Sequence, residues 1–182
     1  QNNLDVPLDY FWKELLRDQG FTVGRLDSRY KGIDRKDAGD GPDFNAELIS
    51  WEHSFTPAIN MYIREELKYK TDLKYYVFGP VQPWDRSGDK TGENLRLAMA
   101  ENPYLNVLVQ SGYYDGACDY FNAQYNLWQM DPGGKLKDRM SWEGYRSGHM
   151  MYLRAEDLAT SNEDIRQFIQ KSLPGKGVPA KY

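Results

Sequence analysis

The sequence predicts an α/β fold, and three observations favour it. Tyr104 to Val109 is a short apolar and β-branched run, typical of a strand buried on both faces of a parallel sheet. A polar loop with Asp115 follows it, and a second strand-like stretch, near Met140 to Tyr145, is followed by His149. Helical patterns follow both stretches. This order favours an open sheet whose chemistry lies beyond the carboxyl ends of its strands.

The N-terminal part of the chain predicts four elements. Apolar residues at helical spacing predict a helix over residues 8 to 20, with Gly20 as its C-terminal cap. Phe21 to Val23 predicts a short strand that runs into a polar turn, Gly24 to Tyr30. Residues 34 to 43, rich in Asp and Gly, predict a solvated loop. The aspartates of this loop recur every third residue, which does not match the ligand spacing of a calcium-binding EF-hand loop.

The middle of the chain predicts two more helices. Phe55 to Leu67 has apolar residues every three or four places, and it tolerates Pro57 only in a first turn. Tyr75 to Phe78 is a short β-prone run broken by Gly and Pro. Glu93 to Ala100 predicts a short helix that ends before a proline.

The C-terminal part predicts two helices around the second strand. Tyr120 to Met130 has a helical pattern and is followed by an Asp-Pro-Gly-Gly turn. Ser161 followed by Asp164 approximates a capping box, so we expect the last helix to begin there and to close at Pro174-Gly175.

Composition excludes several classes of partner. The chain has 23 basic and 27 acidic residues, a net charge of -4 and no Lys/Arg stripe, so we expect no nucleic acid partner. No apolar run approaches the roughly 18 residues that cross a bilayer, so we expect no membrane partner. The single cysteine, Cys118, excludes an internal disulfide. Because the chain begins at Gln1 and has no charged-then-apolar leader, we expect a processed product or a piece of a longer protein.

The two histidines limit the choice of a base that is neutral near pH 7 to His53 or His149. His149 follows Gly148, which permits a tight turn, and Asp115 lies at the end of another predicted strand. An acid at one strand end and a histidine at the next suit two members of a Ser-His-Asp triad, in which the Asp fixes the imidazole tautomer. Judged from spacing alone, a structural role for Asp115 and His149 is favoured over a role in a triad.

Two longer runs resemble the C-terminal part of the serine carboxypeptidase family, especially its bacterial carboxypeptidase-related branch. They are Asn102 to Asp115 (NPYLNVLVQSGYYD) and Tyr145 to Tyr152 (YRSGHMMY). Val23 to Tyr30 (VGRLDSRY) is similar to the same branch, where we expect an architectural role rather than substrate contact. The resemblance implies the C-terminal part of an α/β-hydrolase fold with a helical cap segment over residues 1–102 and a core piece over 103–182, the N-terminal half with the nucleophile being absent.

The same resemblance implies roles for four residues. Asp115 matches the triad aspartate and His149 the triad histidine. Met150 matches a methionine that borders the leaving-group pocket, and Cys118 matches a cysteine near the acyl-side pocket. For Cys118 a role as a small buried hydrophobe is the favoured alternative.

The chain departs from the better-known eukaryotic pattern of the family at two places. Tyr113 replaces the first Asp of a Gly-Asp-x-Asp motif, and Met151-Tyr152 replaces Val-Pro. Both affect pocket details more than the triad. The chain also contains no serine with the Gly-x-Ser-x-Gly flanks of a nucleophile elbow. We therefore expect it to be inactive alone, with the missing N-terminal half of the same protein as its partner.

The implied function is that of a serine-type carboxypeptidase, which releases C-terminal residues from peptides through an acyl-enzyme in the full-length protein. The family also implies a secreted or periplasmic location. We expect no cofactor and no metal, because Glu52-His53 lacks the second histidine of a His-Glu-x-x-His motif, and two histidines with one cysteine do not build a usual structural zinc site. The alternative is a non-catalytic peptide- or carbohydrate-binding domain derived from such a hydrolase.

Overall fold

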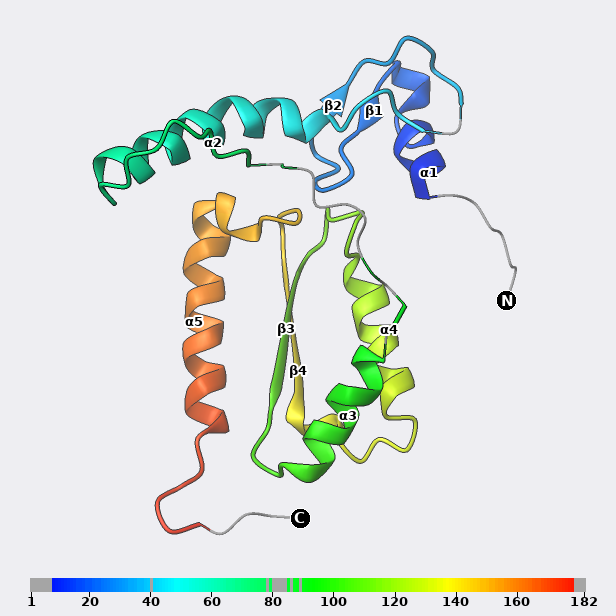
Figure 1. Cartoon of the computed structure of the whole chain (residues 1–182). Coiled ribbons are helices and arrows are strands. Elements are labelled where there is room, and N and C mark those ends of the chain that lie inside the picture. The colour runs from blue at the N-terminus through cyan, green and yellow to red at the C-terminus, as the bar shows by residue number, and fades with distance from the viewer. Residues whose placement is uncertain are drawn as a thin grey trace. The chain divides into compact units, whose positions relative to one another are not determined.

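The computed structural model describes residues 8–39, 41–77, 79, 85, 87–88 and 90–178 (Figure 1). Helices and small sheets alternate along the chain, in agreement with the predicted α/β class. Contacts divide the chain into two units, the first comprising residues 1–25 and 29–87 and the second residues 26–28 and 88–182. Three residues of the N-terminal region thus belong to the second unit.

The first unit combines short elements with one long helix. Its elements are α1 (Leu8–Glu14), the 3-10 turn η1 (Arg17–Gln19), β1 (Thr22–Val23), β2 (Lys31–Gly32) and α2 (Ala46–Glu65). Strands β1 and β2 pair antiparallel. The first expected helix is therefore shorter than predicted, because the chain turns at η1 before it enters β1.

Helix α2 corrects a second prediction. It begins at Ala46 rather than Phe55, so Pro57 lies inside the helix and not in its first turn. Proline leaves the His53 carbonyl, one turn earlier, without its helical donor, but both His53 and Pro57 are exposed and water can satisfy that carbonyl. The early start is set by burial, because Ala46 and Trp51 are buried on the first half of the helix.

The β-prone run at Tyr75 is not a strand over the part that the structure describes, and Phe78 lies outside the described residues. The side chain of Asn60 forms the backbone hydrogen bonds with Tyr75 that a neighbouring strand would otherwise form. Its Nδ2 donates to the Tyr75 carbonyl at 3.1 Å, and its Oδ1 accepts the Tyr75 N–H at 3.0 Å. Both backbone groups of Tyr75 are thereby satisfied without a sheet.

The acidic loop is not wholly solvated, which corrects a further prediction. Asp34 has a side chain only 1% exposed and forms a 2.9 Å ion pair with Nζ of the buried Lys13. Asp34 Oδ1 also accepts the Asp43 N–H at 3.2 Å. Asp40 lies outside the described residues. This loop is therefore anchored to α1 through a buried carboxylate.

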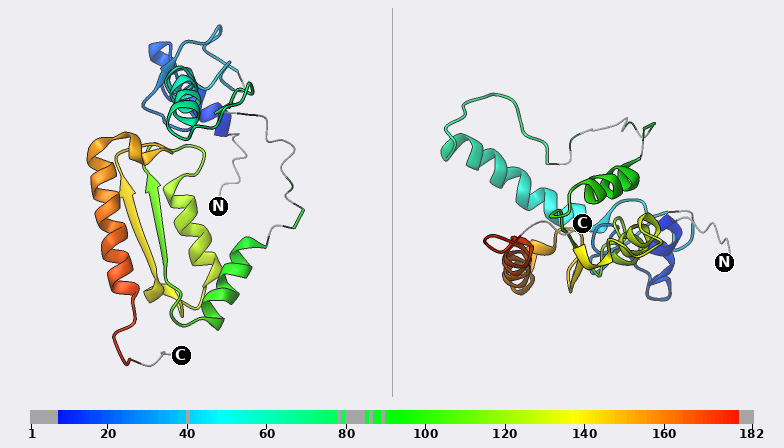
Figure 2. Two further views of the ribbon diagram at one scale, coloured as in Figure 1. Left: turned by 60° about the vertical axis from the view of Figure 1, so that its left-hand side comes forward. Right: turned by 90° about the horizontal axis from the view of Figure 1, so that it is seen from below.

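The second unit is a parallel strand pair between helices. Strands β3 (Val107–Gly112) and β4 (Met140–Tyr145) pair in register from Val107 opposite Met140 to Gly112 opposite Tyr145. Helix α5 (Ala155–Ser172) covers one face, and α3 (Thr91–Glu101) and α4 (Tyr120–Met130) lie on the other, as Figures 1 and 2 show. A short 3-10 turn, η2 (Lys137–Arg139), directly precedes β4, and another, η3 (Met151–Leu153), precedes α5.

An apolar cluster under α3 and α4 forms the core of the second unit. Its buried members are Met99, Met130 and Leu136. On the α5 side the links are polar, because Gln110 Nε2 donates to the Tyr145 hydroxyl at 2.7 Å and that hydroxyl donates to Asp164 Oδ2 at 2.7 Å. Burial, with the hydrogen bond to Asp164, raises the pKa of Tyr145 well above its usual range.

Helix α5 and strand β3 differ from their predicted bounds. The helix begins at Ala155, so Ser161 lies in its interior, buried, and its hydroxyl donates to the Leu158 carbonyl at 3.1 Å instead of capping the helix. The first turn carries Glu156 and Asp157, which favour a helix start through the helix dipole. Strand β3 continues to Gly112, because the polar Gln110 side chain finds buried partners on β4 and α5.

Candidate functional site

The candidate site lies where β3 and β4 end. Because the strands are parallel, their carboxyl ends meet at one edge of the sheet. Backbone hydrogen bonds continue past the strands, from Tyr113 N–H to the Tyr145 carbonyl at 2.9 Å and from Tyr114 N–H to the Ser147 carbonyl at 3.0 Å. The two loops that follow are therefore held side by side.

Gly112 makes this close approach possible. A Cβ atom at this position would overlap the carbonyl oxygens of Ser147 and Gly148, which belong to the loop after β4. Any larger residue would push the two loops apart. The glycine thus brings the residues that follow it close to His149.

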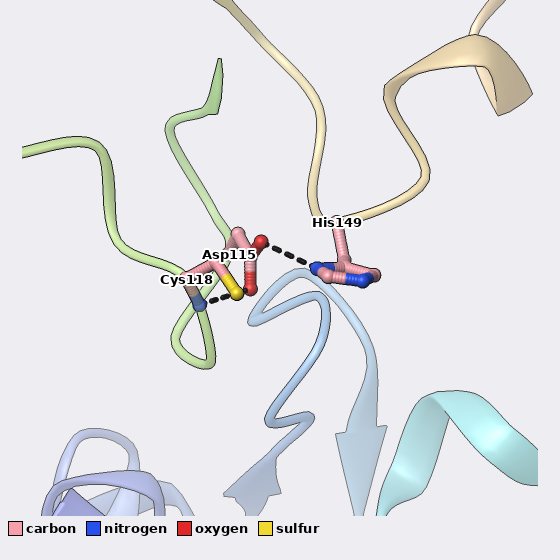
Figure 3. Close-up of side chains that lie close together, drawn as sticks. All are labelled: Asp115, Cys118 and His149. Carbon is pink, nitrogen blue, oxygen red and sulfur yellow. Dashed lines mark hydrogen bonds and ion pairs between the residues drawn. The ribbon is translucent and has the colours of Figure 1, made fainter. Parts of the chain in front are cut away.

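Asp115 and His149 form a hydrogen-bonded pair across the two loops (Figure 3). Asp115 Oδ2 lies 2.7 Å from His149 Nδ1. Asp115 Oδ1 accepts the N–H groups of Ala117 at 2.9 Å and Cys118 at 3.0 Å. The Asp115 side chain is 5% exposed and the His149 side chain 44%. A fixed, buried carboxylate therefore orients a ring that solvent or a ligand can reach.

The orientation of the ring decides its chemistry. With Nδ1 on the carboxylate, the second ring nitrogen of His149 points away from both Asp115 and Cys118 (Figure 3). An ionised carboxylate only accepts hydrogen bonds, so the neutral ring carries its proton on Nδ1 and leaves Nε2 as an acceptor. This arrangement can take a proton from a hydroxyl or a water molecule placed at Nε2.

Cys118 lies beside the pair, and this corrects the favoured alternative of a buried hydrophobe. Its side chain is exposed, and its sulfur lies on the Asp115 side of the imidazole (Figure 3). The acceptor nitrogen of His149 faces away from this sulfur, so the ring is not placed to take the thiol proton there. Met150, directly after His149, is half-buried and precedes η3.

The ligand atoms of Asp115, Cys118 and His149 lie within 4.8 Å of one another, which is close enough for one metal ion to contact all three. Carboxylate, thiolate and imidazole are zinc ligands. Here, however, His149 Nδ1 is bonded to Asp115 Oδ2, and Asp115 Oδ1 already accepts two N–H groups. An ion would have to break the Asp-His bond, so the geometry fits a hydrogen-bonded pair better than a metal site.

The structure adds a buried contact that sequence patterns did not reveal. Ser147 is fully buried, and its hydroxyl donates a short hydrogen bond to Asp157 in the first turn of α5. Arg154 Nη1 holds the other oxygen of Asp157 at 2.7 Å. The loop that carries His149 is thereby tied to α5. No sequence signal marked this contact, because the predicted start of the helix lay after Asp157.

The second histidine has a local structural role. His53 lies on α2 in the first unit, where its Nδ1 is 2.6 Å from the Ile49 carbonyl one turn earlier. A carbonyl only accepts, so Nδ1 of His53 donates, and this histidine faces no carboxylate in that contact. Of the two histidines, His149 is the one oriented by an acid.

Comparison of the chain with family models, curated proteins and solved structures finds no match. In the described ranges, none of the helices combines the length and apolar character needed to cross a membrane.

Proposed function

We propose that this chain supplies the acid-base pair of a serine-type hydrolase that resembles the serine carboxypeptidases, as the C-terminal part of an α/β-hydrolase fold. The 2.7 Å hydrogen bond between Asp115 Oδ2 and His149 Nδ1 at the carboxyl ends of parallel strands is the observation that supports it. In such a pair the acid holds the imidazole in the tautomer that can accept a proton.

In the proposed mechanism, His149 Nε2 removes the hydroxyl proton of a serine as its oxygen attacks the scissile peptide carbonyl. The resulting imidazolium, stabilised by Asp115, gives this proton to the departing amine, and the C–N bond breaks to leave an acyl-enzyme. His149 then takes a proton from water as the water oxygen attacks the ester carbonyl. The ester C–O bond breaks, the shortened peptide leaves as a carboxylic acid, and His149 returns the proton to the serine oxygen. Asp115 remains ionised throughout.

The serine of this mechanism would come from polypeptide outside the 182 residues, because no serine of the chain has the flanks of a nucleophile elbow. The resemblance implies that the substrate is the C-terminal end of a peptide, with Met150 and Cys118 beside the leaving and acyl groups. The exposed position of Cys118 next to the pair agrees with such a place. The same resemblance implies a secreted or periplasmic enzyme.

The test is active-site labelling of the protein from its natural source with a fluorophosphonate, followed by peptide mapping. We expect label on a serine outside these 182 residues, in a longer or associated polypeptide. In the full-length protein, His149→Ala should abolish labelling, whereas the matched control His53→Ala should leave it unchanged, because the ring of His53 hydrogen-bonds to its own helix. If the natural product is this chain alone and nothing labels, the hydrolase proposal fails and a binding domain becomes the better account.

A further inference from the structure

A short stretch, Leu26–Ser28, contacts both loops that carry the Asp115-His149 pair, and we call it the arch. The chain leaves the first unit after Arg25 and returns to it at Arg29, and the three residues between belong to the second unit. Pairing of β1 with β2, and a 3.0 Å hydrogen bond from Gly24 N–H to the Tyr30 carbonyl, close the base of this arch. Its ends are therefore held by a hairpin before it reaches the site.

Two backbone hydrogen bonds join the arch to the two loops of the site. The Leu26 carbonyl accepts the N–H of His149 at 2.8 Å. The Ser28 N–H donates to the carbonyl of Tyr114, the residue before Asp115, at 2.9 Å. One segment thus fixes the backbone of the base and the backbone next to the acid.

Packing at Gly148 supports the same conclusion. Asp27 is only 2% exposed, and a Cβ atom on Gly148 would lie 2.6 Å from the Cβ and Cγ atoms of Asp27 and 2.6 Å from the Leu26 carbonyl oxygen. No side chain fits between the arch and the loop at this point. The backbone before His149 is therefore clamped between Leu26–Asp27 and β3.

We propose that Leu26–Ser28 is a positioning segment that keeps the His149 ring on Asp115. The ring is 44% exposed, so side-chain packing alone restrains it weakly, and the arch supplies the restraint through the His149 backbone. Displacement of a catalytic group by 1 Å can cost about 10²-fold in rate. The catalytic consequence rests on the proposed function, whereas the positioning itself can be measured on the 182-residue chain.

The measurement is nitrogen-15 NMR of the full chain labelled at histidine, in which His53 is an internal reference. For His149 we expect the proton on Nδ1, an unprotonated Nε2, and an Nδ1–H that exchanges slowly with water because Asp115 accepts it. Ser28→Pro removes the N–H that bonds Tyr114, and Gly148→Ala forces the arch away. Either change should speed exchange of Nδ1–H about five- to tenfold, the loss of one ordinary hydrogen bond. His53 signals should not change.

Gly133→Ala is the matched control, because a Cβ there would meet only Lys135 Cγ at 3.9 Å. Circular dichroism reports whether each variant is folded, and Asp27→Ala, which keeps both backbone hydrogen bonds, provides a milder change if the others unfold. Wild-type exchange rates in folded Ser28→Pro and Gly148→Ala would overturn the positioning role, whereas Asp27→Ala, which removes only part of the packing against Gly148, should speed exchange by a smaller factor. If the wild-type chain lacks the slowly exchanging Nδ1–H of His149, the Asp115-His149 hydrogen bond is contradicted. If that signal is present but fluorophosphonate labels no serine, only the proposed hydrolase is contradicted.

Discussion

Two buried carboxylates of this protein, Asp34 in the first unit and Asp115 in the second, are built in a similar way. Oδ1 accepts one backbone N–H in Asp34 and two in Asp115. Oδ2 faces a basic side chain in both, at 2.9 Å from Lys13 Nζ and 2.7 Å from His149 Nδ1. The partners differ in exposure, because Lys13 is 4% exposed and His149 is 44% exposed. The same carboxylate geometry can therefore serve a buried structural pair or an accessible acid-base pair.

The basic partners also differ in their remaining groups. Lys13 Nζ has only donors, and it donates to the Gly41 carbonyl at 3.2 Å in addition to its ion pair. His149 has a second nitrogen that accepts a proton and faces away from its acid. Because Lys13 is buried and its ammonium group can only donate, the first pair has a structural role. Because His149 is exposed and its Nε2 can accept a proton, the second pair is a candidate for proton transfer.

Of the substitutions that test the difference between the two pairs, Asp115→Asn should have the largest effect, which is a loss of turnover. Because Oδ1 accepts two backbone N–H groups, the amide nitrogen of the asparagine would face His149 and force Nδ1 to accept, leaving the proton on Nε2. If the chain belongs to the proposed hydrolase, turnover of the full-length protein should fall by roughly 10⁴. Peptidase assays measure this fall, and nitrogen-15 shifts of His149 in the 182-residue chain report the tautomer.

The control for Asp115→Asn is Asp138→Asn, an exposed carboxyl of the same unit. It should leave both the rate and the tautomer unchanged. A near-normal rate in Asp115→Asn would show that Asp115 has no part in the reaction.

Lys13→Met should have the next largest effect, on stability and not on chemistry. It leaves Asp34, 1% exposed, without its cation, and removing one partner of a buried pair costs about 3–5 kcal/mol of unfolding free energy. Adding Asp34→Asn should restore most of this loss, because the amide oxygen still accepts the Asp43 N–H. Urea unfolding of the single and double variants measures both effects.

The exposed Lys36 provides the control, and Lys36→Met should change the unfolding free energy by less than about 0.5 kcal/mol. Equal losses at the two lysines would mean that the buried pair does not hold the first unit together.

Tyr145→Phe tests a third carboxylate contact, between Tyr145 and the half-buried Asp164. Loss of the hydroxyl removes hydrogen bonds with Gln110 and Asp164 and should cost about 1–2 kcal/mol at neutral pH. Because the folded state raises the pKa of Tyr145, unfolded chains lose this proton first as pH rises above about 10. The stability difference between wild type and Tyr145→Phe should therefore shrink at alkaline pH, as urea unfolding at about pH 8 and about pH 11 would show. A difference that grows with pH would contradict this sign.

Cys118→Ser should have the smallest effect. Any residue except proline keeps the backbone N–H that bonds Asp115 Oδ1, and the thiol is exposed. We expect a change of less than about 0.5 kcal/mol in unfolding free energy and a normal Nδ1–H signal of His149. A lost signal would show that the thiol itself, and not only its backbone, supports the pair.

Local patterns predicted some elements well and others poorly. Helix α4 has the bounds that its apolar spacing indicates, because that spacing depends on neighbouring residues alone. Helices α2 and α5 begin earlier than predicted, and their first turns bury Ala46, Glu47 and Asp157. Burial of a polar residue such as Glu47 leaves no periodic apolar signal in the sequence.

The sequence by itself determined which groups end the two strands of the second unit: an aspartate after one and a histidine after the other, each beside glycine. Only the tertiary structure decided that Asp115 and His149, 34 residues apart, meet at 2.7 Å, that the arch bonds the backbone of Tyr114 and His149, and that Asp34 pairs with Lys13. The physical reason is that local patterns encode strands and turns through near neighbours, whereas these hydrogen bonds depend on strand register and on close backbone contacts between distant segments.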